Sequence, residues 1–290
     1  MKSGAIRAFW ICLPLLLVAT GLAVWNPAGD FWGSVEPPKA QCEAYSTSRL
    51  RAAKVLTPEI YDPQKLDRLL REPQNTVSNL AYVFVGLAVL LSSRRQISRS
   101  FGVAGVFLGL GSGIYHASLL PEWRMIDILG VYVVLCSLLI VGYAAAFRLA
   151  GRRFDFAATV AAWLAAVPAG IHRNDLRIAG FKLLDSTYVV VAAVSLGVVS
   201  VLLCWRHARG SRRYLLGVIA LILAAPIAFF GGLADRSGGL LANPEALIQG
   251  HTLWHGFGTA AMLAAYEAFA ATGFDRSVFE RGPQRPTMKS

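Results

Sequence analysis

The chain has 290 residues, of which 55% are hydrophobic and only 16% are charged, and its mean hydropathy is +0.51. This composition is too apolar for an ordinary soluble domain of that length and indicates a membrane protein. The formal net charge of +11 does not indicate nucleic-acid binding, because arginines beside membrane segments and anionic lipid headgroups explain it.

Hydrophobic segments nearly free of charged residues recur along the whole chain. A helix needs about 20 apolar residues to cross a hydrocarbon core about 30 Å thick, and most of these segments are long enough. We therefore expect an all-α membrane protein, with a seven-helix bundle preceded by one extra N-terminal hydrophobic helix. The expected crossings are residues 8–29, 73–93, 100–121, 128–147, 156–172 (or to 181 if its three charged residues are tolerated), 186–205, 214–234 and 246–266.

The first crossing has two interpretations. Lys2 and Arg7 precede the apolar run from Ala8 to Trp25, an arrangement that also suits a secretory signal. The run is long for a signal, however, and no A-x-A cleavage site follows it. We therefore expect residues 1–25 to form a membrane anchor that is kept.

The remaining chain divides into three parts. Residues 26–72 contain proline and mixed charge, and they predict an external linker with one short amphipathic helix. Residues 73–273 predict one bundle with short loops, and residues 274–290 a polar, disordered cytoplasmic tail. Four cysteines without a CxxC pair favour neither a disulfide framework nor a thiolate metal site.

Arginine-rich connections alternate along the chain with connections of mixed charge. Short cytoplasmic loops carry an excess of Lys and Arg, so the arginine-rich connections are expected on the cytoplasmic side. Both termini share that side, and we expect an integral multi-pass membrane protein with its termini in the cytoplasm. The arginine-rich stretches are residues 94–99, 148–153, 206–213 and 276–289.

Ionisable residues converge near the opposite, outer face. His116 follows Arg99 by 17 residues, which is about 25 Å along a helix. Asp127 begins the next crossing at that face, and His251 and His255 lie in the first turns of the last crossing. Ionisable groups inside a membrane segment are costly and usually face the bundle interior. The topology therefore predicts one polar site that all four side chains share.

The spacing of these residues indicates a metal site. Residues four apart share a helix face, as Ser112 and His116 do, and as His251 and His255 do. Two imidazoles from one helix and a third from another match a catalytic zinc site with an open fourth position. The run HTLWH lacks the glutamate of H-E-x-x-H, so a general base must come from elsewhere, and Asp127 is the candidate.

A further polar stripe begins the second crossing. Glu72, Asn75 and Asn79 fall on one helix face, and Ser78 lies beside them. Helix capping after Pro73 explains part of this pattern. Amides and a carboxylate on the inner stripe of a membrane helix also favour hydrogen bonds to a neighbouring polar site, so these residues are expected to support it.

Four sequence features together resemble the alkaline ceramidases. They are EPQNTVSNLAY, GSGIYHASL, the aspartate Asp127, and HTLWH on the last helix. This family belongs to a superfamily of seven-helix membrane hydrolases that also includes the progestin and adiponectin receptors. The resemblance covers about residues 42–270 and implies a seven-transmembrane-helix hydrolase bundle. It also implies zinc ligands at His116, His251 and His255.

The resemblance further implies the roles of other residues. Ser112 would stabilise the oxyanion, and Asp127 would handle the proton of the attacking water. Family members are also calcium-dependent through a pattern near D-W-C-E-x-N-Y, of which KAQCEAY keeps only a part. A calcium ion bound by Glu43 and Glu72 is therefore an implication of the resemblance alone.

The expected function is a zinc-dependent membrane amidase acting near the outer face. It would hydrolyse the N-acyl amide bond of a ceramide-like lipid to a fatty acid and a free amine, with the acyl chain among Leu, Val and Phe side chains. The alternative is a receptor-like or lipid-binding member of the superfamily with structural zinc. An intramembrane serine protease is disfavoured because Leu110 replaces the glycine of its motif, and haem is disfavoured because His251 and His255 share one face.

Overall fold

The computed structural model describes residues 2–28, 31–32, 68–171, 177–178, 181–182, 186–235, 241, 246 and 248–275. Within these residues the structure is helical apart from short turns and one two-stranded hairpin, so the all-α prediction is confirmed. The helices are α1 (Lys2–Trp25), α4 (Pro73–Ser78), α5 (Leu80–Ser92), α6 (Gln96–Ser118), α7 (Pro121–Phe147), α8 (Arg152–Ile171), α9 (Ser186–Ala208), α10 (Arg212–Ala234) and α11 (Gly250–Ala270). The strands β1 (Arg177–Ile178) and β2 (Phe181–Lys182) pair antiparallel.

Each expected crossing coincides with a helix, or with the nearly continuous pair α4 and α5. Five helical segments of the described chain are long and apolar enough to cross a membrane. This finding supports a membrane protein, while the seven-helix count and the side of each terminus stay predictions. The five segments are Gly4–Trp25, Pro73–Ser92, Gln96–Ser118, Glu122–Phe147 and Arg212–Ala234.

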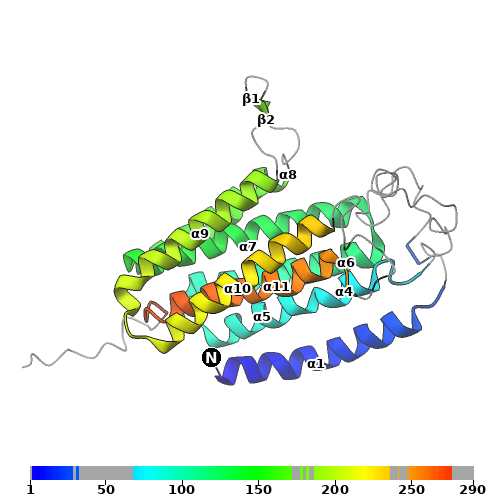
Figure 1. Cartoon of the computed structure of the whole chain (residues 1–290), viewed down its shortest axis with the longest axis horizontal. Coiled ribbons are helices and arrows are strands. Elements are labelled where there is room, and N and C mark those ends of the chain that lie inside the picture. The colour runs from blue at the N-terminus through cyan, green and yellow to red at the C-terminus, as the bar shows by residue number, and fades with distance from the viewer. Residues whose placement is uncertain are drawn as a thin grey trace, which may run out of the picture.

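The helices lie side by side along the long axis, with α1 on one edge of the bundle next to α5 (Figure 1). Large apolar side chains on the flanks remain exposed. Leu164 on α8 and Ile222 and Phe230 on α10 each expose 63–65% of their surface. Such exposure is costly in water but normal against lipid tails, so it agrees with the membrane assignment.

Small residues allow the central helices to approach closely. A Cβ atom added to Gly86 of α5 would lie 2.6 Å from the carbonyl oxygen of Gly102 on α6, so the two backbones are in contact. Helix α6 ends at Leu119, which has φ 56°, and Pro121 begins α7 almost at once. The tight turn makes α6 and α7 an antiparallel pair and sets the end of α6 beside the start of α7.

The segment before α4 connects α1 to the end of α6. Asn26 and Leu70 exchange two hydrogen bonds, each 2.9 Å long, between the asparagine side chain and the leucine backbone. The backbone N–H groups of Arg71 and Glu72 then donate to the carbonyls of Ala117 and His116, both at 3.0 Å. These bonds satisfy carbonyls that the helix end leaves without partners. Residues 68–72, called the strap below, are thereby fixed to α6.

The predicted domain boundaries fall partly outside the described residues. Most of the 26–72 linker, including Glu43 and its predicted amphipathic helix, and residues 276–290 of the tail lie there. Within the described part, α1 packs along α5, with Gly4 against Ser92 and with Ala8 and Cys12 buried. The first helix is therefore integrated with the bundle in this structure.

Candidate metal centre

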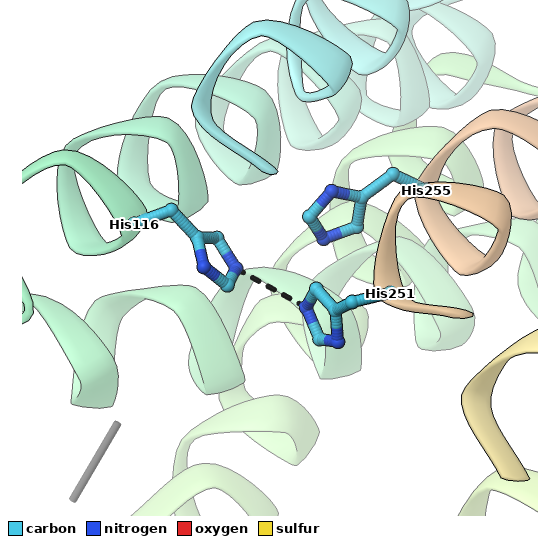
Figure 2. Close-up of side chains that lie close together, drawn as sticks. All are labelled: His116, His251 and His255. Atoms are coloured by element: carbon cyan, nitrogen blue, oxygen red, sulfur yellow. Dashed lines mark hydrogen bonds between the residues drawn. The ribbon is translucent and has the colours of Figure 1, made fainter. Parts of the chain in front are cut away.

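Three histidines converge at one end of the bundle. His116 lies in the last turn of α6 and is 1% exposed, and His251 and His255 lie in the first two turns of α11. Figure 2 shows the ring of His116 directed toward the two rings of α11. The sequence prediction that these residues share one site is therefore confirmed in its geometry.

The spacing of the ring nitrogens suits one metal ion. One ligand nitrogen from each histidine can be chosen so that all lie within 4.8 Å of one another. The Nε2 atoms of His116 and His251 are 3.2 Å apart. Two nitrogens bound tetrahedrally to zinc at about 2.0–2.1 Å would be about 3.3–3.4 Å apart. The donor set and its spacing therefore fit zinc, and a metal ion could bind here.

The other ring nitrogens of His116 and His255 are held by protein groups. Nδ1 of His116 lies 2.6 Å from Oε2 of Glu72, a buried carboxylate. Nδ1 of His255 lies 2.8 Å from Oγ of Ser78, whose own proton is donated to the carbonyl of Asn75. The serine oxygen must therefore accept the Nδ1 proton of His255. In both rings Nε2 keeps its lone pair for a metal, the arrangement usual for metal-binding histidines.

His251 has a similar but longer contact. Its Nδ1 lies 3.5 Å from Oδ2 of Asp235, which follows α10 and is 6% exposed. A Cβ atom added to Gly250 would overlap the carbonyl oxygen of Gly231 and lie 2.7 Å from the nitrogen of Asp235. The missing side chain at Gly250 lets the end of α10 reach the start of α11, which sets Asp235 beside His251.

Asp235 is the site residue that sequence reasoning missed. In the sequence it stands beside Arg236 in a connection of mixed charge, and nothing in its spacing links it to a histidine. A useful signal was present, since a carboxylate ends one predicted crossing just before the crossing that carries His251. A metal-binding histidine needs a partner for its second nitrogen, and that need singles out such a carboxylate.

Glu72 is held in place by the strap and by Asn75. The Nδ2 atom of Asn75 donates to Oε2 of Glu72 at 3.0 Å, and Nη1 of Arg71 donates to the carbonyl of Ser118 at 2.7 Å. Burial alone would raise the pKa of Glu72, but the hydrogen bond and charge of His116, with the Asn75 amide, lower it below its ordinary value. The carboxylate is therefore ionised and acts as a proton acceptor for His116.

Glu72 was also expected as a calcium ligand with Glu43. The described contacts of its carboxylate are to His116 and Asn75. Glu43 lies outside the described residues, so the calcium prediction stays open. Asn79 was expected to support the site. Its Nδ2 donates to the carbonyl of Asn75 at 2.9 Å, so this hydrogen bond joins two residues of the same polar stripe.

Ser112 lies one turn before His116 and is 1% exposed. Its Oγ atom has no hydrogen-bond partner among the described residues, and the same is true of Oδ1 of Asn75 and of Asn79. Buried polar atoms without partners are rare, and they are expected to bind water or a ligand. Ser112 therefore has an available hydroxyl beside the histidine cluster.

Asp127 lies in the second turn of α7, at the same end of the bundle. Its neighbour Ile126 packs so closely on Gly111 that a Cβ added there would lie 2.7 Å from the isoleucine side chain. Asp127 interacts electrostatically with Tyr82, and the Tyr82 ring lies edge-on to His255 at 6.0 Å. Asp127 is thus linked to the histidine cluster through Tyr82 and lies near the level of Ser112.

An apolar cavity of about 480 Å³ lies beside the histidine cluster: Tyr82, whose ring is edge-on to His255 at 6.0 Å, lines it, and none of the three histidines is among its described lining residues. It begins at Tyr82 and Trp254 and follows one face of α11 to Ala265, a distance of about 16 Å along the helix. The remaining walls come mainly from α7, α9 and α10, and include Leu135, Leu139, Val198, Leu221 and Phe229.

Comparison of the chain with protein-family models finds no match, and comparison with curated proteins finds none either. The histidines, their neighbours and the apolar cavity are therefore the features that indicate a function.

Proposed function

We propose that the protein is a zinc-dependent membrane amidase that hydrolyses the N-acyl amide bond of a ceramide-like lipid to a fatty acid and a free amine. The observation that carries the proposal is the convergence of three histidines beside an apolar cavity, with Tyr82 between His255 and that cavity. The resemblance to the alkaline ceramidases adds the substrate class.

The histidines favour a catalytic ion over a structural one. Structural zinc sites use four protein ligands, whereas a catalytic site has three and keeps one open position. His116, His251 and His255 supply three among the described residues. A zinc ion held there would lower the pKa of a water molecule to about 7 and polarise the amide carbonyl.

Asp127 and Ser112 carry the proton and charge transfers of the proposed reaction. The water oxygen bonds to the carbonyl carbon and the C–N bond breaks, which gives the acid and the amine. Asp127 accepts the proton of the water and delivers it to the leaving nitrogen. Ser112, whose hydroxyl has no partner among the described residues, donates a hydrogen bond to the carbonyl oxygen as negative charge develops on it.

The apolar cavity suits the acyl chain of such a lipid. Its walls are almost entirely aliphatic and aromatic, so an acyl chain can pass from the surrounding lipid into the cavity without meeting polar groups. Because the cavity starts at Tyr82, against His255, a chain lying in it would present its carboxamide to the histidines. The cavity thus favours a long-chain amide over a small soluble one.

The first test measures zinc content and fatty-acid release by the purified full chain with an N-acyl lipid. His116→Ala is expected to lose both the zinc and the activity. His207→Ala is the matched control, because His207 contacts the carbonyl of Ala146 near the far end of α9 and belongs to no cluster in the described chain. Full activity in His116→Ala would overturn the proposal.

Asp127→Asn separates the amidase from the receptor-like alternative. In an amidase we expect this variant to keep its zinc and to lose activity by a factor of about 10² to 10⁴, the usual effect of a general base. A lipid-binding protein with structural zinc would keep its lipid affinity and would show no turnover even as wild type.

A further inference from the structure

A separate cleft of about 590 Å³ lies between α5, α6 and α8. It is lined at the start of α6, where Gln96 stands 20 residues before His116, a separation of about 30 Å along the helix. The cleft is therefore at the opposite end of the bundle from the histidines, and the proposed amidase activity makes no use of it.

One end of the cleft, at the start of α6, is cationic. Arg94 and Arg99 line it together with Gln96, and no carboxylate is among its described lining residues. Arg99 forms no ion pair with another described residue. Asp155 of α8 is held in a bidentate pair by Arg95. Arg94 and Arg99 thus give the lining of this cleft a positive charge.

The part of the cleft further along α6 is apolar. Val103 lies one turn beyond Arg99, about 6 Å further along α6, and Leu90 and Trp163 form the opposing walls. The indole of Trp163 is fixed, because its Nε1 donates to Oγ of Ser100 at 3.1 Å. The arginines at one end of the cleft and the apolar side chains one helical turn further along α6 make the cleft amphipathic.

A hydroxyl without a partner among the described residues also lines the cleft. Thr159 stands one turn before Trp163 on α8 and lines the cleft. Its Oγ1 atom is buried and has no hydrogen-bond partner among the described residues. A ligand with an oxygen acceptor between an anionic group and an alkyl chain would complete its hydrogen bonding.

We propose that this cleft binds an anionic phospholipid. Its phosphate lies between Arg94 and Arg99, an ester oxygen accepts from Thr159, and one acyl chain lies against Val103 and Trp163. Guanidinium groups match phosphate in shape and charge, and basic pockets between membrane helices recognise anionic headgroups. A zwitterionic headgroup adds a cation for which the described lining has no carboxylate, so the cleft favours anionic over zwitterionic lipid.

Native mass spectrometry of the full chain tests the proposal. The protein is taken from nanodiscs of equal phosphatidylglycerol and phosphatidylcholine, and retained lipids are counted. Wild type is expected to retain phosphatidylglycerol selectively, and Arg94→Gln/Arg99→Gln is expected to lower that selectivity by a factor on the order of thirty. Arg209→Gln/Arg212→Gln is the matched control, since it removes two exposed arginines from the connection between α9 and α10 and should retain the lipid.

Unchanged selectivity in Arg94→Gln/Arg99→Gln, or an equal loss in the control, would overturn the proposal. Val103→Trp adds an independent arm, because it fills the apolar part of the cleft without changing its charge. Loss of the retained lipid in this variant supports a whole phospholipid in the cleft. Retention at the wild-type level would show that no acyl chain lies there, which contradicts the proposal. Circular dichroism of each variant confirms that the helices are intact.

Discussion

Oε2 of Glu72 lies 2.6 Å from Nδ1 of His116, and both side chains are almost completely buried. The two residues are 44 positions apart in the sequence, and the strap brings them together by hydrogen bonding to the end of α6. The carboxylate fixes both the orientation of the ring and the nitrogen that carries its proton.

Glu72→Gln is expected to weaken metal binding by a factor of about 10 to 100, the usual effect of removing such a partner. The amide keeps the shape but loses the charge that stabilises the Nδ1 proton of His116. Competition with a chelator for bound zinc measures the change. Glu267→Gln is the control, because Glu267 pairs with Arg213 near the far end of α11. Equal zinc affinity in Glu72→Gln and wild type would contradict the assigned role.

Gly250→Ala is expected to destabilise the fold by about 1–3 kcal/mol, because the added methyl group would overlap the backbone of Gly231 and Asp235. Zinc affinity should fall as well, since Asp235 would move away from His251. Gly256→Ala on the same helix has open space around it and should stabilise the fold by about 0.5–1 kcal/mol. Thermal unfolding with and without zinc compares the two, and equal midpoints would exclude close α10–α11 packing at this position.

Under the proposed amidase function, Ala261→Leu is expected to shorten the acyl chain that the cavity accepts. Ala261 lines the middle of the cavity, and the larger side chain would fill the space beyond Gly258. For the longest chains we expect kcat/KM to drop by about tenfold or more, with short chains and zinc content unaffected. Release of fatty acids from a series of N-acyl lipids tests this, and a uniform loss across all lengths would argue against an acyl site.

Asp275→Asn is expected to make stability less dependent on pH. Asp275 follows α11 and accepts from the backbone of Arg95 and from Tyr266. Burial raises the pKa of its carboxyl, and neighbouring hydroxyl and arginine groups offset only part of this effect. A carboxyl with a raised folded-state pKa stabilises the fold below its unfolded pKa of about 3.9, and the contribution is lost as pH rises through the folded value.

At about pH 7.5 the wild type therefore holds an unfavourable buried charge that Asp275→Asn removes. The variant should melt at a higher temperature than wild type at that pH and at nearly the same temperature at about pH 4. Melting curves at both pH values check the prediction. A shift of the same size at both values would mean that the effect is one of shape and not of charge.

The helices and the histidine cluster could be predicted from the sequence because both depend on short-range spacing. Apolar runs of helical length located the helices, and counting residues from Arg99 placed His116 at the depth of His251 and His255. Membrane helices must satisfy their backbone hydrogen bonds internally, which keeps them regular and makes such counting dependable. The number of helices that cross the membrane depends also on how each helix lies relative to the bilayer, which residue spacing does not determine.

The partners of the histidines depended on tertiary packing. Glu72 was placed on a stripe with Asn75 and Asn79, but its contact with His116 arises from strap hydrogen bonds between main-chain groups. Asp235 reaches His251 only because Gly250 permits α10 and α11 to touch. Residues far apart in the sequence do not reveal by their side-chain types where two backbones come into contact.

The strap has a consequence for the first helix. Asn26, just past the end of α1, is bound to Leu70, and Glu72 two residues later holds His116. If a ligand at the histidines stabilises the strap and so the docking of α1, thermodynamic reciprocity requires that docking of α1 strengthens the binding of that ligand by the same factor. The affinity for a ligand at the histidines would then measure how firmly α1 is docked on the bundle.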